Sequence, residues 1–153
     1  MVKSFQGIRK EEPKKAEVQA ISVSDYMSTN LITFRADQSI FEVVETLLKN
    51  RISGGPVVND HNELIGVISE GDCLKEVVKG QYHNMPILSG SVSEHMATNV
   101  VSISPETNIF DCADKFLTMR LRRFPVIENG RLIGQISQKD VMKAVKNIKS
   151  ATW

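Results

Sequence analysis

Apolar residues recur along this chain with two spacings, one typical of helices and one typical of strands. In two segments they stand at i, i+3, i+4, i+7 and i+8, which places them on one face of a helix. The spacing therefore predicts an amphipathic helix in each half of the chain. The two faces contain Ile40, Val43, Val44, Leu47 and Leu48, and Ile109, Cys112, Ala113, Phe116 and Leu117.

Shorter apolar runs on both sides of these helices predict strands. Residues 31–33 and 100–103 are β-prone and precede the helices. After each helix come two runs separated by a turn, as in a β-hairpin; the second turn contains Asn129-Gly130, a pair that readily takes positive φ. A further amphipathic helix closes each half, so the order is β-α-β-β-α, twice. The hairpin runs are 56–58 with 64–69 and 124–127 with 132–137, and the closing helices carry Leu74, Val77 and Val78, and Val141, Met142 and Val145.

The two halves also match each other residue by residue. Met27 corresponds to Met96, an offset of 69 residues that persists through the Pro-Val strands. After one deletion in the hairpin turn the offset is 68, and Asp72 corresponds to Asp140. Colinear matches with one gap in a turn indicate a tandem duplication.

The duplication suggests how the chain is organised. A unit of about 60 residues buries little surface alone, so we expect the two copies to pack through their sheets as an α+β fold with approximate two-fold symmetry. Such packing creates two equivalent clefts, which are natural ligand sites. We expect an extended N-terminal arm at 1–20, which is rich in Lys and Glu, repeat 1 at 21–79, a linker at 80–92 and repeat 2 at 93–148.

Composition narrows the class of protein. The 153 residues are 41% hydrophobic and 24% charged, as in a globular protein. With 19 basic and 18 acidic residues the net charge is +1, so phosphate recognition would have to be local. Since no apolar run reaches the roughly 18 to 20 residues of a membrane span and no secretory signal is evident, we expect a cytoplasmic protein. Cys73 and Cys112 form no C-x-x-C motif and are expected to be buried free thiols.

A Ser-x-x-Asp motif recurs where the second hairpin strand of each half meets the closing helix. It is Ser69-Glu70-Gly71-Asp72 in the first copy and Ser137-Gln138-Lys139-Asp140 in the second. One interpretation is helix capping, because Ser and Asp oxygens accept from free helical N–H groups. The other is nucleotide binding, with phosphate at the helix N-terminus and the ribose hydroxyls on the Asp carboxylate. Recurrence agrees with both interpretations, since a duplicated cap would recur too.

The loops before the first hairpin strands differ between the copies. Gly54 and Gly55 precede Pro56 in the first copy, where missing side chains either let a flat ligand approach or only make the loop flexible. The second copy has Arg122 and Arg123 there, which would suit phosphate oxygens or simply be solvated. Phe124, at the place of Gly55, would either stack on a base or block the cleft.

No catalytic or metal-binding pattern stands out. His61, His83 and His95 lack the spacing of metal ligands, and no Cys/His cluster is present. Walker, G-x-G-x-x-G and G-x-S-x-G motifs are absent. We therefore expect neither an enzyme nor a metal site.

The repeated unit, with its Gly-h-h-Ser-x-x-Asp ending, resembles the CBS domain, and two in tandem resemble a CBS pair, or Bateman module. The resemblance covers roughly residues 21–148 and is carried by residues 66–72, residues 134–140 and the two Pro-Val strands. It suggests a free-standing bacterial CBS-domain protein. It implies clefts between the repeats that bind AMP, ADP, ATP or S-adenosylmethionine, with no required cofactor.

Several residues acquire roles by this resemblance alone. Asp72 and Asp140 would hold the ribose, and Ser69 and Ser137 would lie near phosphate. The resemblance also implies a homodimer built through the helices and ligand-dependent control of an unknown protein partner. Other residues would border the adenine or line the rest of the clefts: Ile32, Thr33, Val101 and Ser102, and Gly54, Gly55, Pro56, Arg122, Arg123, Phe124 and Pro125.

Two other functions stay open at this point. In the first, the clefts are empty, the Ser-x-x-Asp residues are only caps, and the chain is an interaction scaffold. The second, more distant, is RNA or DNA binding through Arg120, Arg122 and Arg123, which would depend steeply on salt.

Overall fold

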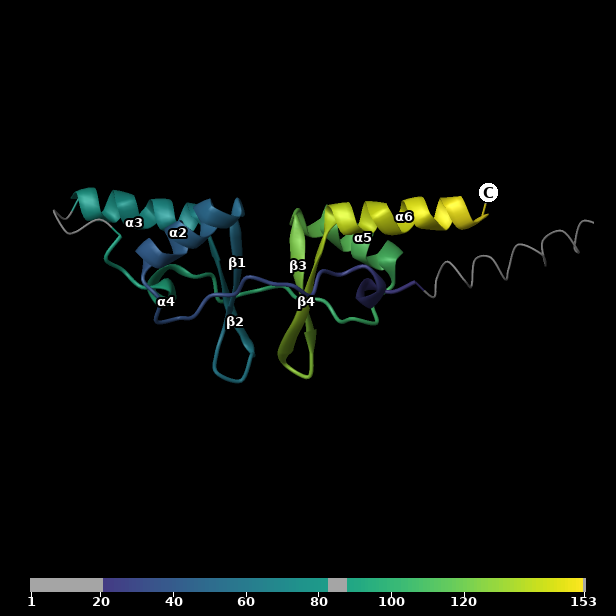
Figure 1. Cartoon of the computed structure of the whole chain (residues 1–153), viewed down its shortest axis with the longest axis horizontal. Helices are drawn as coiled ribbons and strands as arrows, with labels where there is room; N and C mark the ends of the chain where they lie inside the picture. The colour runs from purple at the N-terminus through teal and green to yellow at the C-terminus, as the bar shows by residue number, and fades with distance from the viewer. Residues whose placement is uncertain (1–20, 83–87, 153) are drawn as a thin grey trace, which may run out of the picture. The chain divides into compact units, whose positions relative to one another are not determined.

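The computed structural model describes residues 21–82 and 88–152 (Figure 1). The arm expected at 1–20 and His83 therefore lie outside the described residues. Five α-helices, one 3-10 helix and two two-stranded sheets are present in the described part of the chain. In chain order they are η1 (Val23–Asp25), α2 (Ile40–Asn50), β1 (Gly54–Val58), β2 (Leu64–Ser69), α3 (Glu70–Tyr82), α4 (Val92–His95), α5 (Ile109–Met119), β3 (Arg123–Glu128), β4 (Arg131–Ser137) and α6 (Gln138–Thr152).

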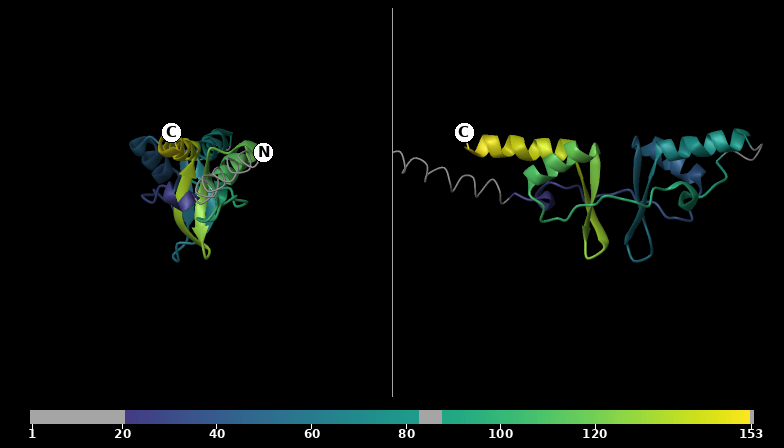
Figure 2. Two further views of the ribbon diagram at one scale, coloured as in Figure 1. Left: turned by 90° about the vertical axis from the view of Figure 1, so that its right-hand side faces the viewer. Right: turned by 180° about the vertical axis from the view of Figure 1, so that it is seen from behind.

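These elements form two compact units. Unit 1 comprises the described parts of Met1–Thr29, Ser102–Glu128 and Ile133–Trp153, and unit 2 comprises Asn30–Val101 and Asn129–Leu132. In unit 2 the helices α2 and α3 pack together beside the antiparallel hairpin of β1 and β2. In unit 1 the helices α5 and α6 do the same beside β3 and β4 (Figure 2). Both hairpins and the helices after them agree with the predicted order.

Neither unit is a single sequence repeat, because the first residues of each repeat join the hairpin of the other repeat. In unit 1 the Ser28 N–H donates to the Gln135 carbonyl of β4 at 2.8 Å. In unit 2 the Ala97 and Val67 backbones exchange two hydrogen bonds of 2.9 Å. An edge strand presents unpaired backbone groups, and these segments supply partners for them. The sequence pattern did not predict this exchange.

The predicted helix faces are confirmed except at their last positions. Ile40, Val43 and Leu47 are buried on α2, whereas Leu48 is 74% exposed. The equivalent Leu117 on α5 is 78% exposed. Each helix begins with a side-chain cap, from Ser39 on α2 and Asn108 on α5, and ends in a left-handed arginine. Each helix therefore buries a narrow apolar stripe, and Leu48 and Leu117, at the edge of the predicted face, are exposed to solvent.

The strands predicted at 31–33 and 100–103 are wrong. The chain makes a single parallel bridge at Phe34, just after the first segment, and another at Ile103, the last residue of the second. Phe34 donates to the Pro56 carbonyl and accepts from the Val58 N–H, both at 2.9 Å. The next donor along the ladder toward Ile32 would be the Pro56 nitrogen, which carries no hydrogen. Proline therefore stops the strand after one bridge. Pro125 stands in the same relation to Ile103.

No helix in the described part of the chain combines the length and the apolar character that crossing a membrane requires.

Candidate functional site

The Ser-x-x-Asp motif of unit 2 forms a reciprocal cap at the start of α3. Asp72 Oδ2 accepts from both the Ser69 N–H and the Ser69 hydroxyl at 2.9 Å. In return, the Ser69 Oγ accepts from the Asp72 N–H at 3.4 Å. This is the geometry expected from the capping interpretation. The cap uses Oδ2 of Asp72, and the other carboxylate oxygen, Oδ1, lies 3.9 Å from the Lys75 ammonium.

The motif of unit 1 repeats this cap at the start of α6. Asp140 Oδ2 accepts from the Ser137 N–H at 2.9 Å, and the Ser137 Oγ accepts from the Asp140 N–H at 3.2 Å. Ser69, Asp72, Ser137 and Asp140 are all half-buried. Side chains at this depth reach solvent, so both motifs combine a structural cap with an accessible polar edge.

The first N–H groups of both helices are also engaged. The Glu70 N–H donates to the Ser53 carbonyl at 2.8 Å, and the Gln138 N–H donates to the Arg122 carbonyl at 3.2 Å. Together with the caps, these bonds use two of the donors that a phosphate at the helix N-terminus would need. Fewer backbone N–H groups are therefore free for a phosphate than the sequence suggested, and phosphate binding there would depend more on side chains.

In unit 2 the structure brings several predicted site residues together. Gly54 pairs with Ser69 in the ladder between β1 and β2. A Cβ added at Gly55 would lie 3.0 Å from the carbonyl oxygen of Ile32, so that carbonyl lies directly beside β1. Because Pro56 has no N–H to offer, the Ile32 carbonyl lacks the partner that an extended ladder would supply. A hydrogen-bond acceptor thus lies beside Gly55, one residue after the ladder partner of Ser69, on a half-buried residue next to the exposed Thr33.

The hypothesis that Gly55 leaves room for a flat ligand is wrong. A Cβ at Gly55 would lie 2.8 Å from Cε2 of Phe34, which is 1% exposed, so an aromatic ring already fills that space. Phe124, at the equivalent place in unit 1, is fully buried, and its ring centroid lies 4.5 Å from that of Phe116. The Phe124 side chain therefore belongs to the core and neither stacks on a base nor blocks a cleft.

The remaining predicted residues of the second copy are distributed differently. Arg122 and Arg123 are exposed, at the end of the loop where it enters β3, and Pro125 is buried within that strand. Val101 and Ser102 are half-buried and precede the single bridge at Ile103. The Arg122 backbone is tied to the start of α6, which brings it close to the Ser137 cap.

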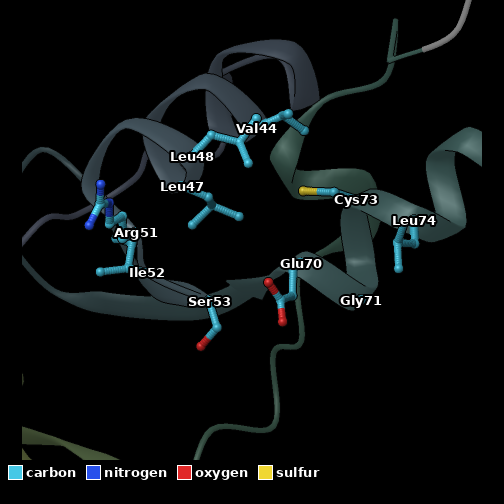
Figure 3. Close-up of a pocket in the computed structure, with 10 residues that line it drawn as sticks. All are labelled: Val44, Leu47, Leu48, Arg51, Ile52, Ser53, Glu70, Gly71, Cys73 and Leu74. Carbon is cyan, nitrogen blue, oxygen red and sulfur yellow. The ribbon is translucent and has the colours of Figure 1, made fainter.

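An apolar groove of about 760 Å³ lies beside this site in unit 2. Side chains of α2 and of the start of α3 face it from opposite sides (Figure 3). None of the predicted nucleotide-binding residues lines it, although Ser53 and Glu70 adjoin Gly54 and Ser69 in sequence. Its lining residues are Val44, Leu47, Leu48, Arg51, Ile52, Ser53, Glu70, Gly71, Cys73 and Leu74.

The structure also joins ionisable residues that the sequence spacing did not connect. Glu76 of α3 is buried, and its Oε2 contacts Nε2 of His95 on α4. Glu94 adds a second carboxylate to the pair. Only the packing of α4 against α3 makes these residues neighbours, and the one available signal was a lone Glu within the apolar face of a predicted helix.

Both cysteines are free and buried, as predicted. Burial raises the pKa of Cys112 from 9.0 to about 11, partly opposed by Lys115. Burial, and then the carboxylates of Asp72 and Glu70, also raise the pKa of Cys73. Since the thiolate is the nucleophile, neither residue has the character of a reactive cysteine.

Comparison with known proteins identifies the family. The CBS domain model matches residues 23–79 and 92–147. The chain belongs to the CBS-domain family. The predicted tandem CBS pair and its mixed α and β fold are therefore confirmed. MJ1225 of Methanocaldococcus jannaschii is 31% identical over 121 residues, and the match covers 79% of this chain and 41% of that protein's length.

Solved CBS-pair structures resemble this fold closely. CBSX2, a protein of Arabidopsis thaliana, in complex with AMP is 28% identical, with a TM-score of 0.73 over 84% of this chain and 98% of that one. The CBS domain pair of MJ0100 in complex with 5'-methylthioadenosine and S-adenosyl-L-methionine is 24% identical, with a TM-score of 0.66. It covers 84% of this chain and 98% of that one, and at this identity it supports the fold.

Proposed function

We propose that this CBS pair is a regulatory module that binds an adenosine-containing ligand, such as AMP, ADP, ATP or S-adenosylmethionine, at its Ser-x-x-Asp junctions. Ligand binding then controls a protein partner. The observation that carries the proposal is the Ile32 carbonyl, which lacks a ladder partner because of Pro56 and lies beside Gly55, the residue after the ladder partner of Ser69. CBSX2, at 28% identity, is known in complex with AMP.

The chemistry of each group fits a nucleoside. The Ile32 carbonyl is an acceptor for the exocyclic amino group of adenine, a specificity that backbone atoms commonly provide. Asp72 keeps Oδ1 outside the cap, and a carboxylate oxygen accepts from ribose hydroxyls. Because the Asp72 Oδ2 acceptor stays with Ser69, cap and ligand use different oxygens of one side chain. A ligand can therefore bind without dissolving the start of α3.

Recognition of phosphate falls to different groups in the two units. In unit 1, the exposed Arg122 and Arg123 carry forked donors that suit phosphate oxygens, beside the Ser137–Asp140 cap. In unit 2 the corresponding loop has Ser53 and glycines, so its phosphate contacts would come from the Ser69 hydroxyl. That hydroxyl would turn its proton from Asp72 Oδ2 to the phosphate, while the Ser69 N–H keeps the cap. We therefore propose that unit 1 prefers the more highly phosphorylated nucleotides.

A constitutive scaffold is the second candidate. It is favoured by the reciprocal caps, which account for Ser69, Asp72, Ser137 and Asp140 without any ligand. In that case the domain pair binds its partner equally with and without nucleotide. A ligand can shift a conformational equilibrium only through its differential affinity for the two states.

Isothermal titration calorimetry with AMP, ADP, ATP and S-adenosylmethionine separates the two candidates. We expect binding by the wild-type chain and a loss of about 10-fold or more in Asp72→Asn, which keeps an oxygen for the cap but removes the carboxylate charge. Ser39→Ala is the matched control, because it removes a helix cap away from the proposed site. The Ser39 Oγ caps α2 by accepting from the Glu42 N–H at 3.1 Å.

The outcomes are distinct. Ser39→Ala should lower the free energy of unfolding by about 1 kcal/mol and leave nucleotide affinity unchanged. Absence of heat with all four ligands in the wild-type chain would favour the scaffold. If Asp72→Asn and Asp140→Asn bind the nucleotides as tightly as wild type does, the Ser-x-x-Asp motif serves only as a helix cap.

We also propose that the module is a homodimer. Exposed apolar side chains on the helices of each unit support this, since a second copy could cover them. In unit 2 they include Leu48, Leu74, Val78 and Tyr82, and in unit 1 Leu117, Met142 and Val145.

A further inference from the structure

A carboxylate and an imidazole that the proposed nucleotide site does not use meet inside unit 2. Glu76 lies on α3 and His95 on α4, with side chains 5% and 11% exposed. Glu76 Oε1 accepts from the Gly90 N–H at 2.9 Å, and its Oε2 contacts His95 Nε2. One oxygen of the carboxylate is thus oriented by the backbone while the other faces the ring. Metal-binding carboxylates are commonly held in this way.

Glu94 completes a set of three donors. One ligand atom from each of Glu76, Glu94 and His95 lies within 4.8 Å of the other two. An imidazole nitrogen with two carboxylate oxygens is a donor set that Zn²⁺ accepts, at bond lengths of about 2.0 to 2.2 Å. Such bonds place neighbouring donors roughly 3.3 Å apart in a tetrahedron, so small side-chain rotations suffice. Glu94 is exposed and can supply most of the movement.

From this geometry we propose that Glu76, Glu94 and His95 form a binding site for a divalent transition-metal ion, with Zn²⁺ as the best match. Three protein ligands leave the fourth position to water. The ion links α4, which begins the second repeat in sequence, to α3, which ends the first.

The other copy of the repeat shows that the fold does not need this cluster. In unit 1 the position of Glu76 is taken by Ala144, which is fully buried, and that of His95 by Tyr26. There the Tyr26 hydroxyl accepts from Asn147, the equivalent of Lys79, at 2.9 Å. The same packing is thus achieved with an alanine and a neutral hydrogen bond. Burying a carboxylate and an imidazole instead costs desolvation, which a bound cation would offset.

The backbone of unit 2 is adapted to the Glu76 carboxylate. A Cβ at Gly90 would lie 2.7 Å from Glu76 Oε1 and 2.8 Å from Cδ. The equivalent residue of unit 1 is Ile21, where Ala144 leaves space for a side chain. In unit 2 the missing side chain of Gly90 makes room for the large Glu76. In unit 1 the small Ala144 makes room for Ile21.

Two contacts of Glu94 shape the expected binding. Its Oε1 accepts from the Ser91 hydroxyl at 3.2 Å and from the Ser91 N–H at 3.4 Å, which holds the carboxylate at the start of α4. Its Oε2 lies 3.9 Å from the Lys79 ammonium, which an incoming cation must displace. Neutralising Lys79 should therefore tighten metal binding.

Calorimetric titration of the full chain with ZnCl₂, with MgCl₂ as comparison, tests the proposal. We expect one Zn²⁺ per chain and much weaker binding of Mg²⁺, which prefers an octahedral shell of oxygens and water. At about 100 times its dissociation constant, Zn²⁺ should raise the thermal midpoint by roughly 5 to 10 °C. A wild-type chain with neither heat nor thermal shift would overturn the proposal.

Variants locate the site. Glu76→Ala with Lys79→Asn and His95→Tyr gives unit 2 the residues of unit 1 at these three positions but keeps Gly90 in place of Ile21. This variant should fold with reduced stability and lose Zn²⁺ affinity at least about 10-fold. Glu94→Gln, an exposed change that keeps an oxygen for Ser91, should weaken binding to a similar extent. Lys79→Gln should strengthen it several-fold. His61→Ala, in the exposed hairpin turn, should change nothing.

Unchanged Zn²⁺ affinity in Glu94→Gln and in the triple variant would contradict the assignment, as would loss of binding in His61→Ala. None of these readouts involves a nucleotide, so they are independent of the proposed ligand function.

Discussion

The ring of Phe34 occupies the space beside Gly55 in which a side chain would otherwise lie. In unit 1 the arrangement is inverted, because Phe124 stands at the place of Gly55 and the smaller Ile103 at the place of Phe34. Phe34, Ile103 and Phe124 are all buried. The large aromatic side chain therefore comes from the segment before the helix in unit 2, as Phe34, and from the hairpin strand in unit 1, as Phe124.

Gly55→Ala should therefore destabilise unit 2. The added Cβ would lie 2.8 Å from the Phe34 ring, and overpacking of this kind costs about 1 to 3 kcal/mol. Urea unfolding followed by circular dichroism measures the loss. Phe34→Ile in the Gly55→Ala background should recover much of it, because the smaller isoleucine, which unit 1 has at the equivalent position 103, leaves room for the added Cβ. Gly54→Ala is the contrast, since its Cβ would meet the Ile68 carbonyl at 2.6 Å and the Phe34 change cannot relieve a backbone clash.

Pro56→Ala should weaken adenosine-ligand binding several-fold. Alanine supplies the N–H that proline withholds, and this donor would pair with the Ile32 carbonyl in competition with the adenine edge. Calorimetry with AMP measures the effect. Pro105→Ala, a buried proline of unit 1, serves as control for the general loss of proline rigidity. Equal affinities in wild type and Pro56→Ala would argue against the Ile32 carbonyl as the adenine acceptor.

Stability should fall between about pH 9 and pH 11 because of Cys112. Burial raises the pKa of its thiol from 9.0 to about 11, so the folded chain keeps a proton that the unfolded chain releases. The stabilising contribution is complete below pH 9 and is lost as the pH rises through 11. Urea midpoints measured across this range should decline less steeply in Cys112→Ala. A slope identical to that of wild type would contradict the prediction.

The same pKa predicts slow chemical modification. At pH 8 only about 0.1% of Cys112 would be thiolate, and the side chain is fully buried. A Cys73→Ala chain should therefore react with maleimide slowly when folded and rapidly in urea. Fast labelling of the folded chain would indicate that α5 opens.

Met142→Glu should convert a dimer into monomers. Met142 is 63% exposed on α6, and a charge there would be desolvated if a second copy covers the helix. Sedimentation equilibrium should then give the mass of one chain, while Lys143→Glu, on the adjacent exposed position, should affect association much less. A wild-type chain that sediments as a monomer at micromolar concentration would refute the dimer.

Much of the fold follows from the sequence because its signals are local. The helical spacing from Ile40 to Leu47 identified the buried face of α2, and the recurrence of Ser-x-x-Asp located the start of both closing helices. The sequence could not separate cap from ligand site, since Ser69 and Asp72 suit both. It also overestimated the first strands, because the effect of Pro56 acts on a residue of another segment, Ile32.

By itself, the sequence determined the duplication, the order of the hairpins and the helices that flank them, and the burial of Cys73 and Cys112, since each depends on residues close together in the chain. Only the tertiary structure decided which segments pair: Ser28 with Gln135, the Phe34 ring with Gly55, and Glu76 with His95. These contacts join residues from different elements. Their free energy comes from packing and from satisfied backbone groups, neither of which leaves a periodic trace in the sequence.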